Sequence, residues 1–222
     1  MLINHLANAA VSHHFARQFN PNVIHAPRDF VPTELTNNVV LEIGAGKGKH
    51  AMLYAAANPN AQIIAIERTQ DKFTAFAKSA KEQHLPNLSP IHADAVAWVV
   101  HGVLPHSLSQ VFILYPNPEP KNKNQRFLHM PFFEFLLSRL QYGGQITLAS
   151  NIGEYITEAE QLLQSVWCLP FIKTDIASTS ARTHFEIKYL TRGERCQELV
   201  ITKPVGYRTR FDDWQADNGG GA

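Results

Sequence analysis

The chain has 222 residues, of which 45% are hydrophobic and 18% charged, so it is long enough to bury the core of one domain. Its formal net charge of +1 lacks the positive excess that is typical of proteins held on nucleic acid by charge alone. Two cysteines, Cys168 and Cys196, are too few for a disulfide framework or a zinc quartet, which agrees with a reducing cytoplasm.

The sequence indicates neither a membrane segment nor a metal site. The first ten residues lack a basic start followed by a long apolar run, and no stretch is apolar enough to cross a bilayer. The eleven histidines lack a metal-ligand spacing such as His-Glu-x-x-His. We therefore expect a cytoplasmic protein without a metal ion, and the sequence leaves its oligomeric state open.

Apolar spacing divides the chain into three parts: residues 1–38, a domain over 39–211 and a flexible, frayed tail over 212–222. The first part is expected to be a helix over 2–19 followed by an irregular connector with Pro21, Pro27 and Pro32. The domain alternates strands with helices, which predicts an α/β fold with a mostly parallel sheet. The expected strands are 39–44, 61–66, 89–92, 110–115 and 145–149, and the expected helices are 47–58, 69–84, 95–101, 127–140 and 152–163.

Two further strands are expected near the end of the domain, over 185–190 and 197–203. The segment Thr191-Arg192-Gly193-Glu194 between them is expected to form the turn of a closing antiparallel hairpin. With these two, the sheet has seven strands.

A glycine-rich turn follows the first strand, in Glu42-Ile43-Gly44-Ala45-Gly46-Lys47-Gly48. Glycines at such a turn let the backbone bend sharply and lie against a ligand. A dinucleotide fingerprint would require a third glycine where Lys49 stands, and the phosphate-binding Gly-Lys-Ser/Thr ending is absent as well. Glu67 ends the second strand about 20 residues later, where a carboxylate can accept both ribose hydroxyls.

This pattern resembles class I S-adenosylmethionine-dependent methyltransferases, which have a Rossmann-like fold. The resemblance implies that the loop holds the methionine part of S-adenosylmethionine, that Glu67 holds the ribose and that an acid after the third strand lies beside the adenine. An acidic residue at the pocket mouth suits a positively charged sulfonium. The implied cofactor-binding residues are Glu42, Gly44, Gly46, Glu67, Asp94 and Ala95. An ordinary glycine turn, and a helix N-cap at Asp94, are the structural alternatives.

A proline-rich loop, Tyr115-Pro116-Asn117-Pro118-Glu119-Pro120-Lys121, follows the fourth predicted strand. Prolines fix their own φ and restrict the preceding residue to extended geometry, so the loop should hold Asn117 and Glu119 in fixed positions. Because reactive groups of open α/β sheets gather beyond the carboxyl ends of the strands, these two residues are catalytic candidates.

Here the chain is similar to the bacterial tRNA (guanine-N7)-methyltransferases, as a divergent member. The similarity runs from about Leu41 to Lys203 and includes Pro116 to Pro118, Ser150-Asn151 followed by Tyr155, Thr183-x-Phe-Glu186 and Arg192-Gly-x-Arg195. The family pattern has aspartate and tryptophan where this chain has Asn117 and Glu119, and Thr-Asp where it has Ser150-Asn151. Its dense basic run is reduced here to Asn122-Lys123-Asn124-Gln125-Arg126.

The resemblance implies methylation of guanine N7 in tRNA. It makes Asn117, Asn151 and Glu119 the catalytic candidates and Lys121, Arg126, Thr183 and Glu186 the substrate-binding candidates. For Glu186 the structural alternative is an ion pair with Arg182 or Arg195. The thinner basic run should weaken tRNA binding. Two other functions stay open: methylation of a small heteroaromatic acceptor, and a non-catalytic RNA-binding role.

Overall fold

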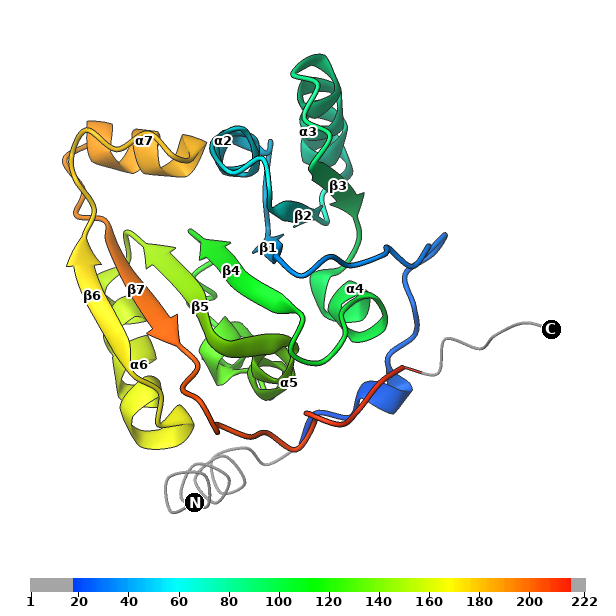
Figure 1. Ribbon diagram of the computed structural model, residues 1–222. Coiled ribbons are helices and arrows are strands. Elements are labelled where there is room, and N and C mark those ends of the chain that lie inside the picture. Colours follow the sequence, from blue (N-terminus) through cyan, green and yellow to red (C-terminus); the bar gives the residue numbers. More distant parts are fainter. Residues whose placement is uncertain (1–17, 217–222) are drawn as a thin grey trace.

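The computed structural model describes residues 18–216, and its described part is built on one seven-stranded sheet (Figure 1). The predicted helix over 2–19 lies almost wholly outside these residues. The strands are β1 (Val39–Ile43), β2 (Gln62–Glu67), β3 (Leu88–His92), β4 (Leu108–Leu114), β5 (Leu140–Ser150), β6 (Phe171–Asp175) and β7 (Gln197–Thr202).

The order of the strands is β3-β2-β1-β4-β5-β7-β6. The pairs from β3 to β5 are parallel, whereas β7 is antiparallel to both of its neighbours, β5 and β6. The prediction of a mostly parallel α/β sheet is thus confirmed. The strand order reverses between β1 and β4, and this reversal positions the site described below.

Alternate residues of the central strands face opposite sides of the sheet, as a period of two requires. Val39 and Leu41 of β1 pack into one buried cluster, with α4 (Ala95–Gly102), α5 (Phe132–Arg139) and α6 (Gly153–Leu162). Val40 packs into a second cluster, with α2 (Lys49–Ala57), α3 (Gln70–Glu82) and α7 (His184–Thr191). Helices therefore cover both faces (Figure 1).

The expected strand over 185–190 is wrong, because these residues form α7. Thr183 caps the helix: its hydroxyl accepts a hydrogen bond from the Glu186 amide at 2.9 Å, which is half of a Thr-x-x-Glu capping box. The strand that pairs with β7 is β6, a mostly exposed segment whose Ile172 points to solvent. The antiparallel pair exists, but α7 lies in its connection and no tight hairpin forms.

Proline and glycine account for two smaller differences. The predicted helix over 127–140 is divided into a 3-10 turn, η3 (Phe127–His129), and α5, with Pro131 at the N-cap of α5. β5 begins at Leu140 rather than at 145 and runs through Gly143 with a register shift against β4. Three short turns complete the described part: η1 (Pro21–Val23), η2 (Lys123–Gln125) and the π-turn η4 (Leu163–Trp167).

The segment after β7 packs on the domain instead of fraying at 212. Asp212 is 5% exposed, and the guanidinium of Arg139 donates to the backbone oxygens of Phe211 at 2.6 Å and Trp214 at 3.0 Å. The Trp214 indole in turn donates to Asn22 of the connector at 3.0 Å. The expected tail is wrong for residues 212–216, and residues 217–222 lie outside the described part.

Candidate functional site

The candidate site is the region between the loops that follow β1 and β4, here called the crevice. The chain leaves β1 toward β2 on one side, whereas β4 lies on the other side, so the loops after β1 and β4 diverge. Ligands of open α/β sheets bind at such a reversal of strand order. The glycine loop, residues 44–48, lies on one side and the proline-rich loop, residues 115–122, on the other.

The three glycines of the first loop all have positive φ, namely 77° at Gly44, 60° at Gly46 and 76° at Gly48. A Cβ atom at Gly44 or Gly46 would meet no atom within 4 Å, whereas a Cβ at Gly48 would lie 1.9 Å from the ring of Phe76. Gly48 is therefore required for packing against α3. At Gly44 and Gly46, in contrast, open space lies beside the backbone.

Glu67 fastens this loop to the end of β2. Its carboxylate accepts from the Gly46 amide at 2.8 Å and from the Thr69 amide at 2.7 Å. The amides of Gly44 and Ala45 both donate to the backbone oxygen of Ile66, at 2.9 and 3.0 Å. Each carboxylate oxygen of Glu67 keeps a second lone pair, which can accept a hydroxyl hydrogen. The carboxylate of Glu67 thus lies beside the glycine loop, and its binding of the ribose stays a prediction.

Glu42 is not at the mouth of the pocket, where we expected it. Its carboxylate is buried and lies 2.8 Å from Nδ1 of His50 on the first turn of α2. The His50 ring in turn packs edge-on against Phe112 of β4, with centroids 4.5 Å apart. Through this contact Glu42 ties α2 to β1.

Asp94 is the N-cap of α4, and Ala95 is the first residue of that helix. One oxygen of Asp94 accepts from the amides of Val96 and Ala97, at 3.0 and 3.2 Å. The capping alternative raised from the sequence is therefore confirmed. A hollow of about 410 Å³ lies next to Asp94 and is lined by the end of β3, including His92 and Ala93, and by residues of the connector.

On the proline-rich loop, Asn117 and Glu119 contact each other. The Asn117 amide nitrogen donates to the Glu119 carboxylate at 2.7 Å. Tyr115 and Glu119, which each precede a proline, have φ values of 52° and 45°, in the left-handed region that is strained for such residues. The loop thus holds an amide and a carboxylate together beside the crevice, and Lys121 is exposed at its end.

Arg126, a predicted substrate-binding residue, is turned inward instead. It is 3% exposed, donates to the backbone oxygen of Pro118 at 2.7 Å and forms an ion pair with Glu158 of α6. Its guanidinium also lies over the ring of Tyr155, 5.2 Å from the centroid. Arg126 therefore anchors the proline-rich loop to α6 and is not available to a phosphate.

Glu186 is the centre of a buried network that links α7 to the end of β4. It is 0% exposed and accepts from the Tyr115 hydroxyl at 2.9 Å and from Nη2 of Arg182 at 2.9 Å. Burial opposes ionisation, but hydrogen bonds from Arg182 and Ser180 outweigh it and lower the pKa of Glu186. The ion-pair alternative is confirmed with Arg182, whereas Arg195 pairs with Asp175 at 2.8 Å.

Thr183 and Asn151 have partners within the protein as well. Thr183 caps α7, and the Asn151 amide nitrogen donates to Glu194 at 2.6 Å. The structure brings Asn117 and Glu119 together on one loop, and it brings Glu67 at the end of β2 next to Gly46 of the glycine loop. Glu42, Arg126 and Glu186 are enclosed by partners within the protein.

Three residues of this arrangement were not singled out from the sequence as site residues. Tyr115 and Arg182 hold Glu186, and His50 holds Glu42. The position of Tyr115 at the end of an apolar strand, immediately before the proline loop, is the signal that could have identified it.

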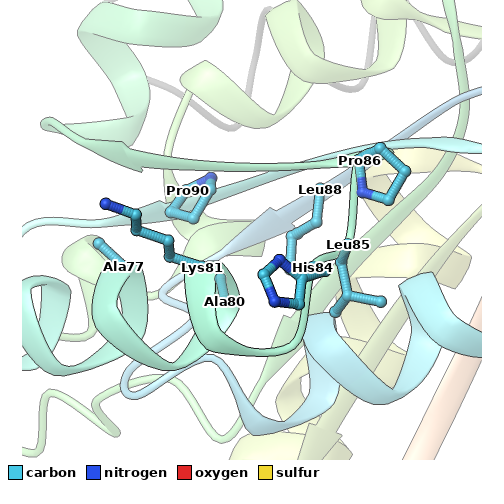
Figure 2. Close-up of a pocket in the computed structure, with 8 residues that line it drawn as sticks. All are labelled: Ala77, Ala80, Lys81, His84, Leu85, Pro86, Leu88 and Pro90. Carbon is cyan, nitrogen blue, oxygen red and sulfur yellow. The ribbon is translucent and has the colours of Figure 1, made fainter.

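A cavity is also formed between α3 and β3 (Figure 2). It measures about 480 Å³ and is lined by the end of α3 and by β3, with Lys81, His84 and Pro90 around it. Among residues 18–216, no group of three or more His, Cys, Asp or Glu side chains is arranged to hold a metal ion. None of the helices described is long and apolar enough to span a membrane.

Comparisons with known proteins identify the family. Residues 36–199 match the model of a family described as a putative methyltransferase. The tRNA (guanine-N(7)-)-methyltransferase of Nitrosospira multiformis is 30% identical over 174 residues, which cover 75% of each chain. The enzyme of that name from Burkholderia ambifaria is 31% identical over 175 residues, covering 75% of this chain and 68% of its own.

A solved structure adds evidence on the fold alone. A SAM-dependent methyltransferase from Aquifex aeolicus superposes with a TM-score of 0.54 at 12% identity, over 90% of this chain and 96% of its own. The strand order, the open glycine loop and the two sequence relatives agree with one another. The chain belongs to the tRNA (guanine-N7)-methyltransferase family, whose fold is that of the class I S-adenosylmethionine-dependent methyltransferases.

Proposed function

We propose that this protein transfers a methyl group from S-adenosylmethionine to N7 of a guanine in tRNA. The observation that carries the proposal is the open glycine loop at the reversal of strand order, in a chain of this family. A Cβ at Gly44 or Gly46 would project into unfilled space beside Glu67, which is the arrangement that a ligand lying flat on the loop requires.

Within this proposal, the loop backbone at Gly44 and Gly46 holds the methionine part of the donor. Glu67 accepts hydrogen bonds from the ribose hydroxyls with the lone pairs that the backbone amides leave free. The Oδ2 atom of Asp94, which does not cap α4, contacts the adenine. The donor, when bound, supplies a methyl group on a positively charged sulfonium. Glu42, enclosed by His50, acts only by fixing α2 to β1.

On the acceptor side, the chemistry needs orientation more than proton transfer. The N7 lone pair of guanine forms the new N–C bond while the C–S bond breaks, and no proton leaves N7. A general base is therefore not required, and holding the two atoms in line supplies up to about 7 to 11 kcal/mol in favourable cases. The proposed product carries a positive charge on the purine.

Glu119 is the group of the proline-rich loop that can stabilise this charge, because Asn117 is neutral. The contact between the two side chains fixes the direction of the carboxylate. Asn117 keeps its amide oxygen free to accept a hydrogen bond from a base edge. Asn151, held by Glu194 at the end of β5, and Thr183 support the walls of the crevice.

The decisive experiment incubates the purified protein with labelled S-adenosylmethionine and bulk tRNA that lacks 7-methylguanosine, and then identifies the labelled nucleoside. We expect labelled 7-methylguanosine. A Gly46→Val variant is the matched control, since its side chain would fill the space over the loop. Donor binding without label in tRNA would refute the proposal and favour a small heteroaromatic acceptor or a non-catalytic role. We also propose a cytoplasmic location, where tRNA is found.

A further inference from the structure

Among residues 18–216, some cations form ion pairs with carboxylates and others form none. Behind the proline-rich loop, Lys123 pairs with Glu154 at 2.5 Å and with Glu158, and Arg126 also pairs with Glu158. Lys123 is thus already partly neutralised, and so is Arg126. Because a cation bound to a carboxylate gains little from a phosphate, this region presents less positive charge than its sequence suggests.

The helices beside the glycine loop present a different surface. Lys72 at the start of α3 and Lys188 of α7 form no ion pair within residues 18–216. Between them stands Phe185, which is 41% exposed. The ammonium of Lys72 lies 6.0 Å from the centre of that ring, so the start of α3 and the start of α7 meet.

A row of aromatic rings connects Phe185 with the start of the proline-rich loop. Phe185 stacks on Tyr189 with ring centres 6.1 Å apart and an interplanar angle of 17°. Tyr189 lies 5.7 Å from Tyr115, the residue that precedes the proline-rich loop. The row therefore runs from the point where the acceptor base is proposed to lie to the exposed face of Phe185 and Lys72.

The chemistry of the proposed substrate fits such a row. Guanine N7 faces the deep, narrow major groove of an A-form helix, which side chains cannot enter, so RNA must be unstacked at the target. An unstacked strand exposes the faces of neighbouring bases, and proteins bind such faces with aromatic rings while lysines pair with the phosphates.

We propose that Lys72, Phe185 and Lys188, here called the α3–α7 surface, bind the tRNA strand next to the target guanine. Phe185 stacks on a flanking base, and the two lysines pair with backbone phosphates. This inference rests on the proposed function and adds to it the part of the protein that holds the tRNA. The charge complementarity of unpaired lysines and a polyanion selects tRNA as the occupant.

The test measures the dissociation constant of unmodified tRNA over a range of salt concentrations, using the full chain. The logarithm of the dissociation constant rises linearly with the logarithm of the salt concentration. Each of Lys72→Gln and Lys188→Gln should reduce the slope of this line by about 1. Phe185→Ala should weaken binding about 5-fold or more at every salt concentration without changing the slope, because stacking releases no counterion. Phe185→Tyr, which keeps a ring, should retain the wild-type affinity.

Lys173→Gln is the matched control, since Lys173 on β6 pairs with Glu160 at 2.8 Å, and its slope should equal that of the wild type. Unchanged slopes for Lys72→Gln and Lys188→Gln, or wild-type affinity for Phe185→Ala, would overturn the inference. If the wild type still methylates tRNA in that case, the proposed function stands while the α3–α7 surface is refuted. A wild type that binds the donor but not tRNA refutes both.

Discussion

Asn117 and Glu119 of the proline-rich loop are proposed to act together on the acceptor base. The amide donates to the carboxylate at 2.7 Å, and both stand on a loop in which three prolines restrict the backbone. Under the proposed function, the carboxylate carries the electrostatic part of catalysis. The amide fixes its direction.

Replacing Glu119 by Gln should therefore lower kcat for tRNA methylation by about 10-fold or more, because a fixed charge near the developing cation is lost. The KM for S-adenosylmethionine should stay unchanged, since the donor is proposed to lie on the other loop. The double variant Asn117→Asp with Glu119→Gln moves the carboxylate by two residues and should recover part of the rate. Equal kcat values for the wild type and Glu119→Gln would exclude a role for this charge.

Gly46 and Gly48 differ in what a methyl group would meet, although both have positive φ. Gly46→Ala should reduce donor affinity at least about 10-fold but cost only about 1 kcal/mol of unfolding free energy, the usual penalty for a left-handed alanine. Gly48→Ala should cost about 3 kcal/mol or more, because its Cβ overlaps the Phe76 ring. Calorimetric titration and denaturant unfolding separate the two effects, and unaltered donor affinity in Gly46→Ala would contradict the proposed cofactor position.

At the scale of elements, Arg126 joins the proline-rich loop to α6. Arg126→Gln removes its ion pair with Glu158 and should lower the unfolding free energy by about 3 kcal/mol, since it breaks a largely buried charge pair. Lys121→Gln, a nearby exposed control, should stay within about 0.5 kcal/mol of the wild type. Denaturant unfolding measures both, and a stable Arg126→Gln protein would mean that the loop is held by other contacts.

The segments that form α7 and β6 show what sequence patterns could not predict here. Thr183-His-Phe-Glu186 followed by Ile-Lys-Tyr-Leu is compatible with a strand by composition, and also with a capped helix. The buried network of Glu186 decides in favour of α7, because the helix brings its carboxylate to Tyr115 from a distant segment and to Arg182 four residues earlier. β6 escaped prediction because its side chains are mostly exposed and its pairing with β7 is what makes it a strand.

At the scale of the whole molecule, Lys203 joins the end of β7 to the junction of α5 and β5. Its ammonium group is 0% exposed and donates to the backbone oxygens of Leu137 and Leu140, at 2.8 and 2.9 Å. Burial lowers the pKa of Lys203 from 10.5 to about 8. The negative charge of Asp212 opposes this shift, and the positive charge of Arg139 adds to it.

Stability should therefore rise with pH through this range. Between the folded pKa of about 8 and the unfolded value of 10.5, the unfolded chain binds a proton that the folded chain does not, so the unfolding free energy increases with pH. From about pH 7.5 to 9.5, the wild type should gain about 2 kcal/mol relative to Lys203→Met. Denaturant unfolding of both proteins at each pH measures the difference, and parallel curves would contradict the lowered pKa.

The sequence by itself determined the parallel sheet, the glycine loop and the positions of Glu67 and Asn117, because continuous apolar runs mark strands buried on both faces and glycines and prolines act through local backbone geometry. Tertiary structure alone decided which charged side chains face the crevice. Glu42, Arg126 and Glu186 are enclosed by His50, Glu158 and Arg182, and these partners come from other segments of the chain in the first two cases and from a folded turn in the third. A charge is available to a ligand only when no such partner reaches it, and that depends on how the elements pack.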